Sequence, residues 1–177
     1  MKLYLVRHGQ TDWNVQRIAQ GRTDIPLNAT GITQAEELRD KTHEYRFDIC
    51  YSSPLVRAVK TAEIVTDGRC PIVKDDLLVE RCFGKYEGTA PPDDWLKYWT
   101  INYHDDEMGM EPLADVFART KVFLEKIKKE HASDENILIV GHGGMLKTLH
   151  FNIVGYDDET DFMNIHFKNG EIWEYEI

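Results

Sequence analysis

Two short apolar runs, far apart in the chain, each lead into a histidine and a glycine, and this pair constrains the fold more than any other feature. Residues 3–6 are apolar and β-prone, and Arg-His-Gly follows at 7–9. Residues 136–140 form a second such run, followed by Gly-His-Gly-Gly at 141–144. Ligands of open α/β sheets bind beyond the carboxyl ends of the strands. We therefore expect two strands of one sheet to bring both imidazoles to a single pocket.

Three segments carry the 3.6-residue period of helices. The first begins at 30–31, the second begins with a Ser-Ser-Pro cap at 52–54 and ends at 67–68, and the third spans 113–130. The expected buried faces are Ile32, Ala35, Leu38 and Tyr45 in the first, Leu55, Val59, Ala62 and Val65 in the second, and Leu113, Val116, Phe117, Thr120, Phe123, Leu124 and Ile127 in the third. A further helix is expected to start at the glycines 143–144 and to run through Met145 to Phe151.

The remaining strands complete the predicted architecture. Short strands are expected at 47–51 and 72–73, and Asn-Gly at 169–170 predicts a hairpin between 162–167 and 171–177. Alternating strands and helices predict an α/β fold, a three-layer α/β/α sandwich whose mostly parallel central sheet has an antiparallel edge. The hairpin is expected either as that edge or as a dimer contact, so the oligomeric state stays open.

Two segments depart from this alternation. Residues 9–28 have no regular period and indicate a long loop beside the first histidine. Residues 84–110, called the lid segment below, contain adjacent prolines and several aromatic residues. We expect them to be an insertion in a single domain of residues 1–177, with one short helix at about 93–103. Its aromatic residues either cover the pocket or pack on one face of that helix.

Bulk composition narrows the class of protein. The formal net charge of −10 disfavours nucleic acids and acidic membranes as partners, because a negative field repels polyanions. The cysteines, Cys50, Cys70 and Cys82, are odd in number and form no CxxC pair, so they indicate neither a disulfide framework nor a zinc ribbon. Without a leader pattern or an apolar run of transmembrane length, the chain is expected to be cytoplasmic.

Five residues together suit phosphoryl transfer. An unprotonated His8 is a competent nucleophile. Arg7 and Arg57 match phosphate oxygens bidentately, and His142 can add a donor from the opposite side. Glu80, which follows an apolar run, suits the proton transfers of a general acid and base. This scheme needs no metal or other cofactor.

The motifs around these residues resemble the histidine phosphatase superfamily, the phosphoglycerate mutase-like family. They are Leu5-Val6-Arg7-His8-Gly9 with Asn14, then Gln20-Gly21, Asp24, Pro26-Leu27, Gly31 and Gln34-Ala35, then Ser52 to Ala62 around Arg57, then Leu78, Glu80, Phe83-Gly84 and Glu87-Gly88, and last Val140 to Gly144. At 110–112 the chain has Met-Glu-Pro where relatives often have Gly-Glu-Ser. We expect this departure to change the start of the helix at 113, and not the chemistry.

The resemblance implies a role for each site residue. It implies that His8 becomes phosphohistidine and that Glu80 is the proton donor. It implies that the phosphoryl group is held by Arg7, Arg57 and His142, assisted by Asn14 and by the backbone around Gln20, Gly21 and Gly143. The remaining histidines show no ligand spacing and are interpreted as structural or surface residues: His43, His104, His131, His150 and His166.

The leading hypothesis is a metal-independent phosphomonoesterase that acts on a small phosphorylated metabolite through a phosphohistidine. The alternatives are a cofactor-dependent phosphoglycerate mutase, an α-ribazole phosphatase as the specific phosphatase, and a non-catalytic phospho-ligand domain. Mutases of the family are longer and carry extra basic residues in the region of the lid segment. Here the lid segment has Lys85 and Lys97 as its only cations, beside Glu87, Asp93, Asp94, Asp105, Asp106 and Glu107. That balance favours a phosphatase and a substrate with little charge beyond its phosphate.

Overall fold

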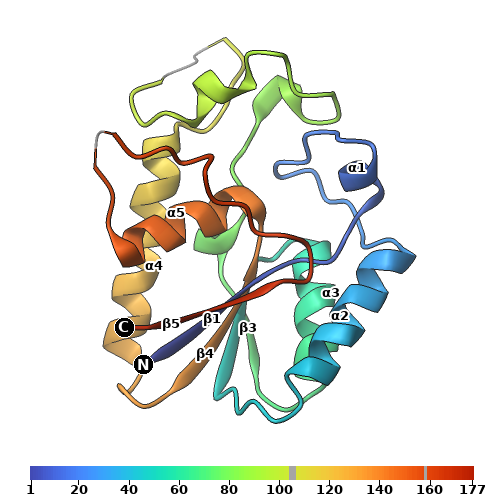
Figure 1. Ribbon diagram of the computed structural model, residues 1–177, viewed down its shortest axis with the longest axis vertical. Helices are drawn as coiled ribbons and strands as arrows, with labels where there is room; N and C mark the ends of the chain where they lie inside the picture. The colour runs from blue at the N-terminus through green and yellow to red at the C-terminus, as the bar shows by residue number, and fades with distance from the viewer. Residues whose placement is uncertain (104–106, 158) are drawn as a thin grey trace.

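A five-stranded sheet organises the chain in a computed structural model that describes residues 1–103, 107–157 and 159–177 (Figure 1). The strands are β1 (Lys2–Arg7), β2 (Ile49–Ser52), β3 (Ile72–Lys74), β4 (Asn136–Gly141) and β5 (Ile172–Glu176), in the order β3-β2-β4-β1-β5. Every pairing is parallel except that of β1 with β5. The predicted α/β sheet with an antiparallel edge is therefore confirmed. His104, Asp105 and Asp106 lie outside the described residues.

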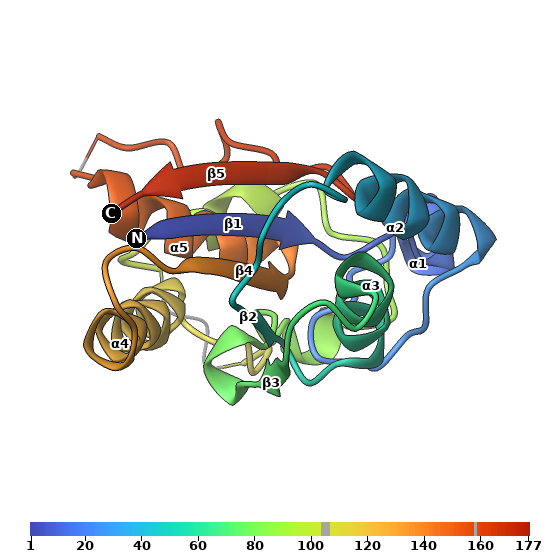
Figure 2. The ribbon, with the colours of Figure 1, turned by 90° about the horizontal axis from the view of Figure 1, so that it is seen from below.

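Helices cover both faces of the sheet, as Figures 1 and 2 show. The helices α2 (Ala29–Lys41) and α3 (Val56–Thr66) lie on one side, and α4 (Leu113–Glu130) and α5 (Gly143–Val154) lie on the other. Alternate residues of a strand point to opposite faces. Accordingly Leu3 and Leu5 join the core beneath α4 and α5, whereas Tyr4 and Val6 join the core beneath α2 and α3.

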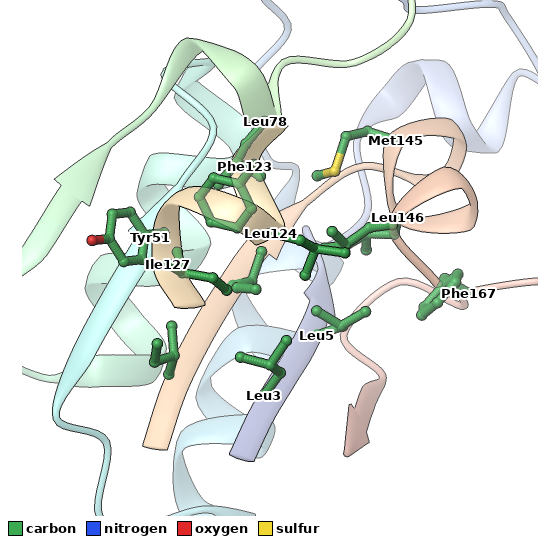
Figure 3. Packing of buried hydrophobic residues seen from close by; sticks show 13 residues of the cluster. Leu3, Leu5, Tyr51, Leu78, Phe123, Leu124, Ile127, Met145, Leu146 and Phe167 are labelled. Atoms are coloured by element: carbon green, nitrogen blue, oxygen red, sulfur yellow. The ribbon is translucent and has the colours of Figure 1, made fainter. Parts of the chain in front are cut away.

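The core beneath α4 follows the predicted pattern. Its buried residues are Leu113, Val116, Phe117, Thr120, Phe123, Leu124 and Ile127, which is the face that the sequence predicts. Figure 3 shows Phe123, Leu124 and Ile127 gathered with Leu3 and Leu5 of β1. Burial of a large aliphatic or aromatic side chain contributes about 1.5–3 kcal/mol to folding. None of the helices in the described residues is both long and apolar enough to cross a membrane.

The predicted faces of α2 and α3 are partly wrong. Helix α2 ends at Lys41, so Tyr45 lies beyond it, and Ile32 is exposed. Helix α3 begins at Val56 with Leu55 as its N-cap and no side-chain cap, two residues after Pro54, which the sequence places in the first turn. Its buried residues are Arg57, Ala58, Thr61, Ala62, Val65 and Thr66. The prediction follows the apolar residues of the helix. It places the buried face wrongly because such a pattern does not predict a buried arginine.

The predicted C-terminal hairpin is wrong in its partner strand. A turn forms at Asn169-Gly170, where Gly170 has a φ of +68° and Glu171 N donates to Lys168 O at 3.2 Å. The strand after this turn, β5, pairs with β1 and not with residues 162–167, which form no strand. The local turn signal is correct, but a long-range pairing with the first strand determines the sheet edge.

The loop at 9–28 and the lid segment lie together above the carboxyl ends of β1 and β4 (Figure 1). The loop contains one turn of helix, α1 (Asp12–Val15), which the sequence analysis does not predict. Three short 3₁₀ helices follow β3: η1 (Asp76–Leu78), η2 (Gly84–Tyr86) and η3 (Trp95–Trp99). The helix predicted at about 93–103 is therefore a five-residue 3₁₀ helix.

Candidate active site

The strand register brings the two histidines together. Arg7 of β1 pairs with Gly141 of β4, so His8 and His142 each follow the last paired residue of neighbouring parallel strands. His8 N donates to Gly141 O at 2.9 Å, which extends the ladder by one bond. The two imidazole centroids are 5.1 Å apart. Parallel pairing thus juxtaposes side chains that are far apart in the sequence.

His8 is held with one ring nitrogen protonated and the other available. Its Nδ1 lies 2.7 Å from Gly9 O, and because a carbonyl only accepts, Nδ1 carries the proton. The lone pair of the neutral ring is therefore on Nε2. Burial, reinforced by Arg57 and Arg7, holds the pKa of His8 well below its ordinary value of 6.5. The imidazole is neutral at physiological pH, as a nucleophile requires.

His142 lies behind the pocket, where it positions Arg57. The Nδ1 atom of His142 accepts from Arg57 Nε at 3.2 Å, which assigns the ring proton to Nε2, and Nε2 donates to Ser53 Oγ at 2.7 Å. Both ring nitrogens thus have protein partners, and burial with Arg57 nearby holds the pKa of His142 well below 6.5. The sequence analysis expects His142 to hold the phosphoryl group. The geometry links it to the pocket through Arg57.

Arg57 enters the interior on the buried face of α3. Its Nη1 donates to Thr23 O at 2.8 Å and its Nη2 donates to Gly21 O at 2.7 Å. Burial lowers the pKa of Arg57 to about 10, although nearby carboxylates oppose this change. The carbonyl of Gly21 therefore orients a cation, in addition to any role of its backbone toward a ligand. A side chain at residue 21, where φ is +52°, would collide with Glu87.

Arg7 carries an unpartnered donor. Its Nη1 donates to Phe167 O at 2.8 Å, while its buried Nε has no hydrogen-bond acceptor among the described residues. A β-carbon on Gly143 would lie 3.5 Å from Arg7 Nε, so the first residue of α5 borders the guanidinium. Buried donors are normally paired. An unpaired N–H beside a helix N-terminus suits an anion.

Thr11 orients the two amide side chains predicted to assist. Thr11 N donates to Asn14 Oδ1 at 3.0 Å, and Thr11 Oγ1 lies 3.0 Å from Gln20 Oε1. The first of these bonds belongs to the capping box of α1. Both amide oxygens therefore point toward Thr11. The NH₂ groups of Asn14 and Gln20 remain to donate into the pocket, which both residues line.

Glu80 is fixed by the N-terminus of α5. Its Oε2 accepts from Gly144 N at 2.9 Å, and its Oε1 accepts from Met145 N at 2.9 Å and from Arg81 N at 2.8 Å. A β-carbon on Gly144 would lie 2.7 Å from Glu80 Oε1, so glycine permits this close approach. Backbone groups thus hold the carboxyl at the pocket wall.

These side chains surround a pocket of about 340 Å³. Eight of the nine predicted site residues line it: Arg7, His8, Asn14, Gln20, Gly21, Arg57, Glu80 and Gly143. The ninth, His142, is not among the lining residues, so the prediction that both imidazoles face the pocket is wrong for His142. Glu80 supplies the only carboxyl among the described lining residues. A larger cavity of about 640 Å³ is lined by residues of η3 and by residues 156–157 and 160–163, and none of the predicted site residues lines it.

The lid segment contributes apolar surface to the pocket. Its lining residues are Pro91, Trp95 and Trp99, and none of its described carboxylates lines the pocket. Glu87 points elsewhere and accepts from Arg22 N, Thr23 N and Thr23 Oγ1. The described acidic residues of the lid segment therefore make no direct contact with the pocket, although Glu87 is close enough to act on the pKa of Arg57, and repulsion of a charged substrate stays a prediction.

Supporting residues that the sequence analysis does not assign to the site include Thr11, Ser53 and Lys147. The threonine follows the first motif directly, and an N-cap signal at Thr11 with Asn14 three residues later predicts its contact. Ser53 and Lys147 carry no local signal, because their partners come from distant segments. The three cysteines are free, and in the described part of the chain no three His, Cys, Asp or Glu side chains gather as a metal site.

The departure at Glu111-Pro112 alters the start of α4. Pro112 occupies the N-cap position without a side-chain hydrogen bond. The Glu111 carboxylate instead bridges Arg119 at 2.9 Å and Arg22 at 3.1 Å. Because Arg22 Nε also reaches Glu80 O at 3.3 Å, this network supports the segment that carries Glu80.

The comparisons with known proteins agree with this geometry. The family model of the histidine phosphatase superfamily (branch 1) matches residues 3–177, and the chain belongs to that family. An uncharacterized phosphatase of Bacillus subtilis, PhoE, is 39% identical over 96% of this chain and 88% of its own length. Phosphoserine phosphatase 1 of Hydrogenobacter thermophilus is 32% identical, over 89% of this chain and 78% of its own length. A 2,3-bisphosphoglycerate-dependent phosphoglycerate mutase of Cytophaga hutchinsonii is 31% identical, over 99% and 87%.

Solved structures show the same fold. Bacillus stearothermophilus YhfR matches with a TM-score of 0.88 at 31% identity, over 98% of this chain and 89% of that one. The α-ribazole phosphatase of Shigella flexneri matches with a TM-score of 0.82 at 28% identity, over the same shares of the two chains. The phosphoglycerate mutase-like architecture predicted from the sequence is thereby confirmed.

Proposed function

We propose that this protein is a phosphomonoesterase that transfers the phosphoryl group of a small phosphorylated metabolite to His8 and then to water. The observation that carries the proposal is the state of His8, whose ring has an unprotonated Nε2 and lines a pocket together with Arg7 and the buried Arg57. Membership in the histidine phosphatase superfamily and the names of several relatives support it.

In the first half-reaction, His8 Nε2 attacks phosphorus and the bond between phosphorus and the leaving oxygen breaks. Arg7 and Arg57 stabilise the charge on the phosphoryl oxygens, assisted by the amides of Asn14 and Gln20. Glu80 donates a proton to the departing alkoxide. The products are an alcohol and a phosphohistidine.

In the second half-reaction, water attacks the phosphohistidine while Glu80, now a carboxylate, takes the proton of the water. The P–N bond breaks, its electron pair returns to His8 Nε2, and inorganic phosphate leaves. Glu80 serves both steps because it is the only carboxyl among the described lining residues. His142 acts as a positioning residue through its bond to Arg57.

The runner-up is a mutase, in which a substrate hydroxyl replaces water in the second step. The phosphoglycerate mutase of Cytophaga hutchinsonii, which is 31% identical to this chain, supports this alternative. A phosphate-release assay in EDTA separates the two, with sugar and nucleoside monophosphates, α-ribazole phosphate and 3-phosphoglycerate as substrates. A parallel isomerisation assay is primed with bisphosphoglycerate. Release without isomerisation supports the phosphatase, isomerisation outpacing release overturns it, and preference for α-ribazole phosphate specifies the substrate.

A further inference from the structure

A buried lysine in the catalytic pocket has no ionic partner. Lys147, on the second turn of α5, lines the pocket and is 6% exposed. No carboxylate of the described residues lies within 4.0 Å of its Nζ. Its contacts are weak for an ammonium group: Met163 Sδ at 3.3 Å and the face of the Trp99 ring at 5.2 Å. Buried charges are ordinarily paired, so this residue needs an explanation.

The surroundings of Lys147 disfavour its charge in the absence of a ligand. Burial lowers its pKa to about 8, with Arg7 acting in the same direction. Glu80 and Asp161 oppose the change without forming an ion pair. A negatively charged group of a ligand, bound in the pocket next to Lys147, would remove this penalty. The phosphoryl group itself has Arg7 and Arg57.

A second unpaired donor lies beside the lysine. Two buried side-chain N or O atoms lack a hydrogen-bond partner among the described residues, Arg7 Nε and Trp99 Nε1, and both residues line this pocket. Arg7 Nε belongs to the phosphate end. Trp99 lies close to Glu80, since a β-carbon on Gly144 would lie 3.0 Å from the indole and 2.7 Å from the carboxyl. The atom of Trp99 in this contact is the ring carbon Cη2, so the six-membered ring lies near the carboxyl that is proposed to protonate the leaving oxygen. Lys147 lies close enough to Glu80 for that carboxyl to affect its pKa.

We propose that Lys147 Nζ, which lies over the Trp99 ring in the pocket, binds a carboxylate on the alcohol part of the substrate. The inference rests on the proposed phosphomonoesterase function and specifies its substrate class. A carboxylate matches the site because it brings one negative charge to one buried ammonium that has no ionic partner among the described residues. A second phosphate brings more charge and three oxygens, whereas the buried ammonium groups among the described lining residues comprise Lys147 alone; Arg17, which also lines the pocket, is exposed. The substrate is therefore a phosphorylated hydroxy acid or amino acid.

Two matched substrate pairs test the proposal. 3-Phosphoglycerate is compared with glycerol 3-phosphate, and O-phosphoserine with O-phosphoethanolamine, because each pair differs in the carboxylate. For the natural chain we expect KM to be lower for the carboxylated member by about tenfold or more, with a smaller change in kcat. Lys147→Met keeps the volume and removes the charge, so it should abolish that ratio through KM. Lys147→Arg should restore part of it, and Lys121→Met, on the exposed side of α4, should leave it unchanged.

The outcomes separate the two proposals. Equal KM values within each pair, or equal losses in both members on Lys147→Met, would overturn the carboxylate site. A loss in kcat alone would make Lys147 a proton donor. Hydrolysis of p-nitrophenyl phosphate reports on the phosphomonoesterase independently of the carboxylate. If no monoester is hydrolysed, calorimetric binding of the same pairs to the His8→Ala variant still tests the site, and equal affinity within each pair would exclude it.

Discussion

The two ends of the catalytic pocket are built in different ways. At the phosphate end, the strands β1 and β4 and the helix α3 position each side chain, and backbone carbonyls fix its orientation. His8 contacts Gly9 O, and Arg7 contacts Phe167 O. At the other end, the lid segment supplies 3₁₀ turns that pack through aromatic contacts such as Trp95 against Phe83. The first end determines the reaction, and the second determines which leaving group fits.

The lid segment is nevertheless anchored to the core. Arg81 is 1% exposed, and it donates to Tyr98 O at 2.6 Å and to Glu111 O at 2.8 Å while lying 5.2 Å from the Trp99 ring. Tyr98 and Trp99 belong to a cluster that includes Leu113 and Phe117 of α4. The lid segment thus presents a defined surface to the substrate. The two ends of the pocket differ in their chemistry. The phosphate end has the fixed cations Arg7 and Arg57, and the lid end has apolar rings and the buried Lys147.

Removal of the nucleophile should have the largest effect, and it should not depend on the leaving group. For His8→Ala we expect kcat/KM to fall by about 10⁴-fold or more on every monoester, because no other lining group of the described residues has the same position. The midpoint of thermal unfolding should change little, because His8 is a buried polar residue and not part of the hydrophobic core. Steady-state assays and a melting curve check this. Activity within tenfold of the natural chain would contradict the assignment of His8.

Loss of the proton donor should distinguish leaving groups. For Glu80→Gln we expect about 10²–10⁴-fold lower kcat on alkyl phosphates and a much smaller loss on p-nitrophenyl phosphate, whose anion leaves without protonation. The glutamine oxygen can keep the bonds from Met145 N and Arg81 N. Parallel kinetics on both substrate types measure the difference. Equal losses would assign the acid role to another group.

The buried lysine should make the protein less stable than its neutral variant. Its pKa falls from 10.5 in the unfolded chain to about 8 in the folded one, in an environment of Arg7, Glu80, Asp161 and the Trp99 ring. Between these values the unfolded state binds more protons, so stability rises with pH and the full cost applies below pH 8. Lys147→Met should therefore raise the free energy of unfolding at pH 7 by at most about 3 kcal/mol. Urea unfolding at pH 7 and pH 10 should show the difference shrinking at the higher pH. A constant difference, or none, would contradict this account.

The orienting hydroxyl should have the smallest effect. For Thr11→Val we expect kcat/KM to fall by about tenfold, because Gln20 loses its partner and the N-cap of α1 is lost. The loss should be similar for good and poor leaving groups, since the phosphate end alone is affected. Thr11→Ser is the matched control because it retains the hydroxyl. Indistinguishable kinetics of the two variants would show that the hydroxyl does not position the amides.

Features that depend on local sequence patterns could be predicted, and features that depend on contacts with distant segments could not. Glycine-flanked histidines at strand ends, and an arginine at the start of a helix, are local patterns, so the gathering of His8 and Arg57 could be predicted. The face of α4 could be predicted because its period is unbroken. The inward rotation of α3 could not, because a buried arginine is stabilised by Gly21 O and Thr23 O from a distant loop.

The remaining errors also arise from distant contacts. The pairing of β5 with β1 joins the two ends of the chain, and no local turn signal specifies it. The acidic composition of the lid segment does not show which carboxylates line the pocket, and none of the described ones does; Glu87 accepts hydrogen bonds from the backbone of residues 22 and 23. Lys147 looks like an ordinary helix lysine in the sequence. Its burial follows from contacts with Trp99 and Met163, which come from other segments.

The central claim is that phosphate passes through His8. The most direct test is to mix the protein with a slowly released monoester, quench it in alkali, where phosphohistidine survives, and map the label by peptide mass spectrometry. We predict a phosphate on the peptide that contains His8, in an amount that reaches steady state before the substrate is exhausted, and its absence in His8→Ala. Turnover without any label on His8, or a label on another residue, would contradict the account.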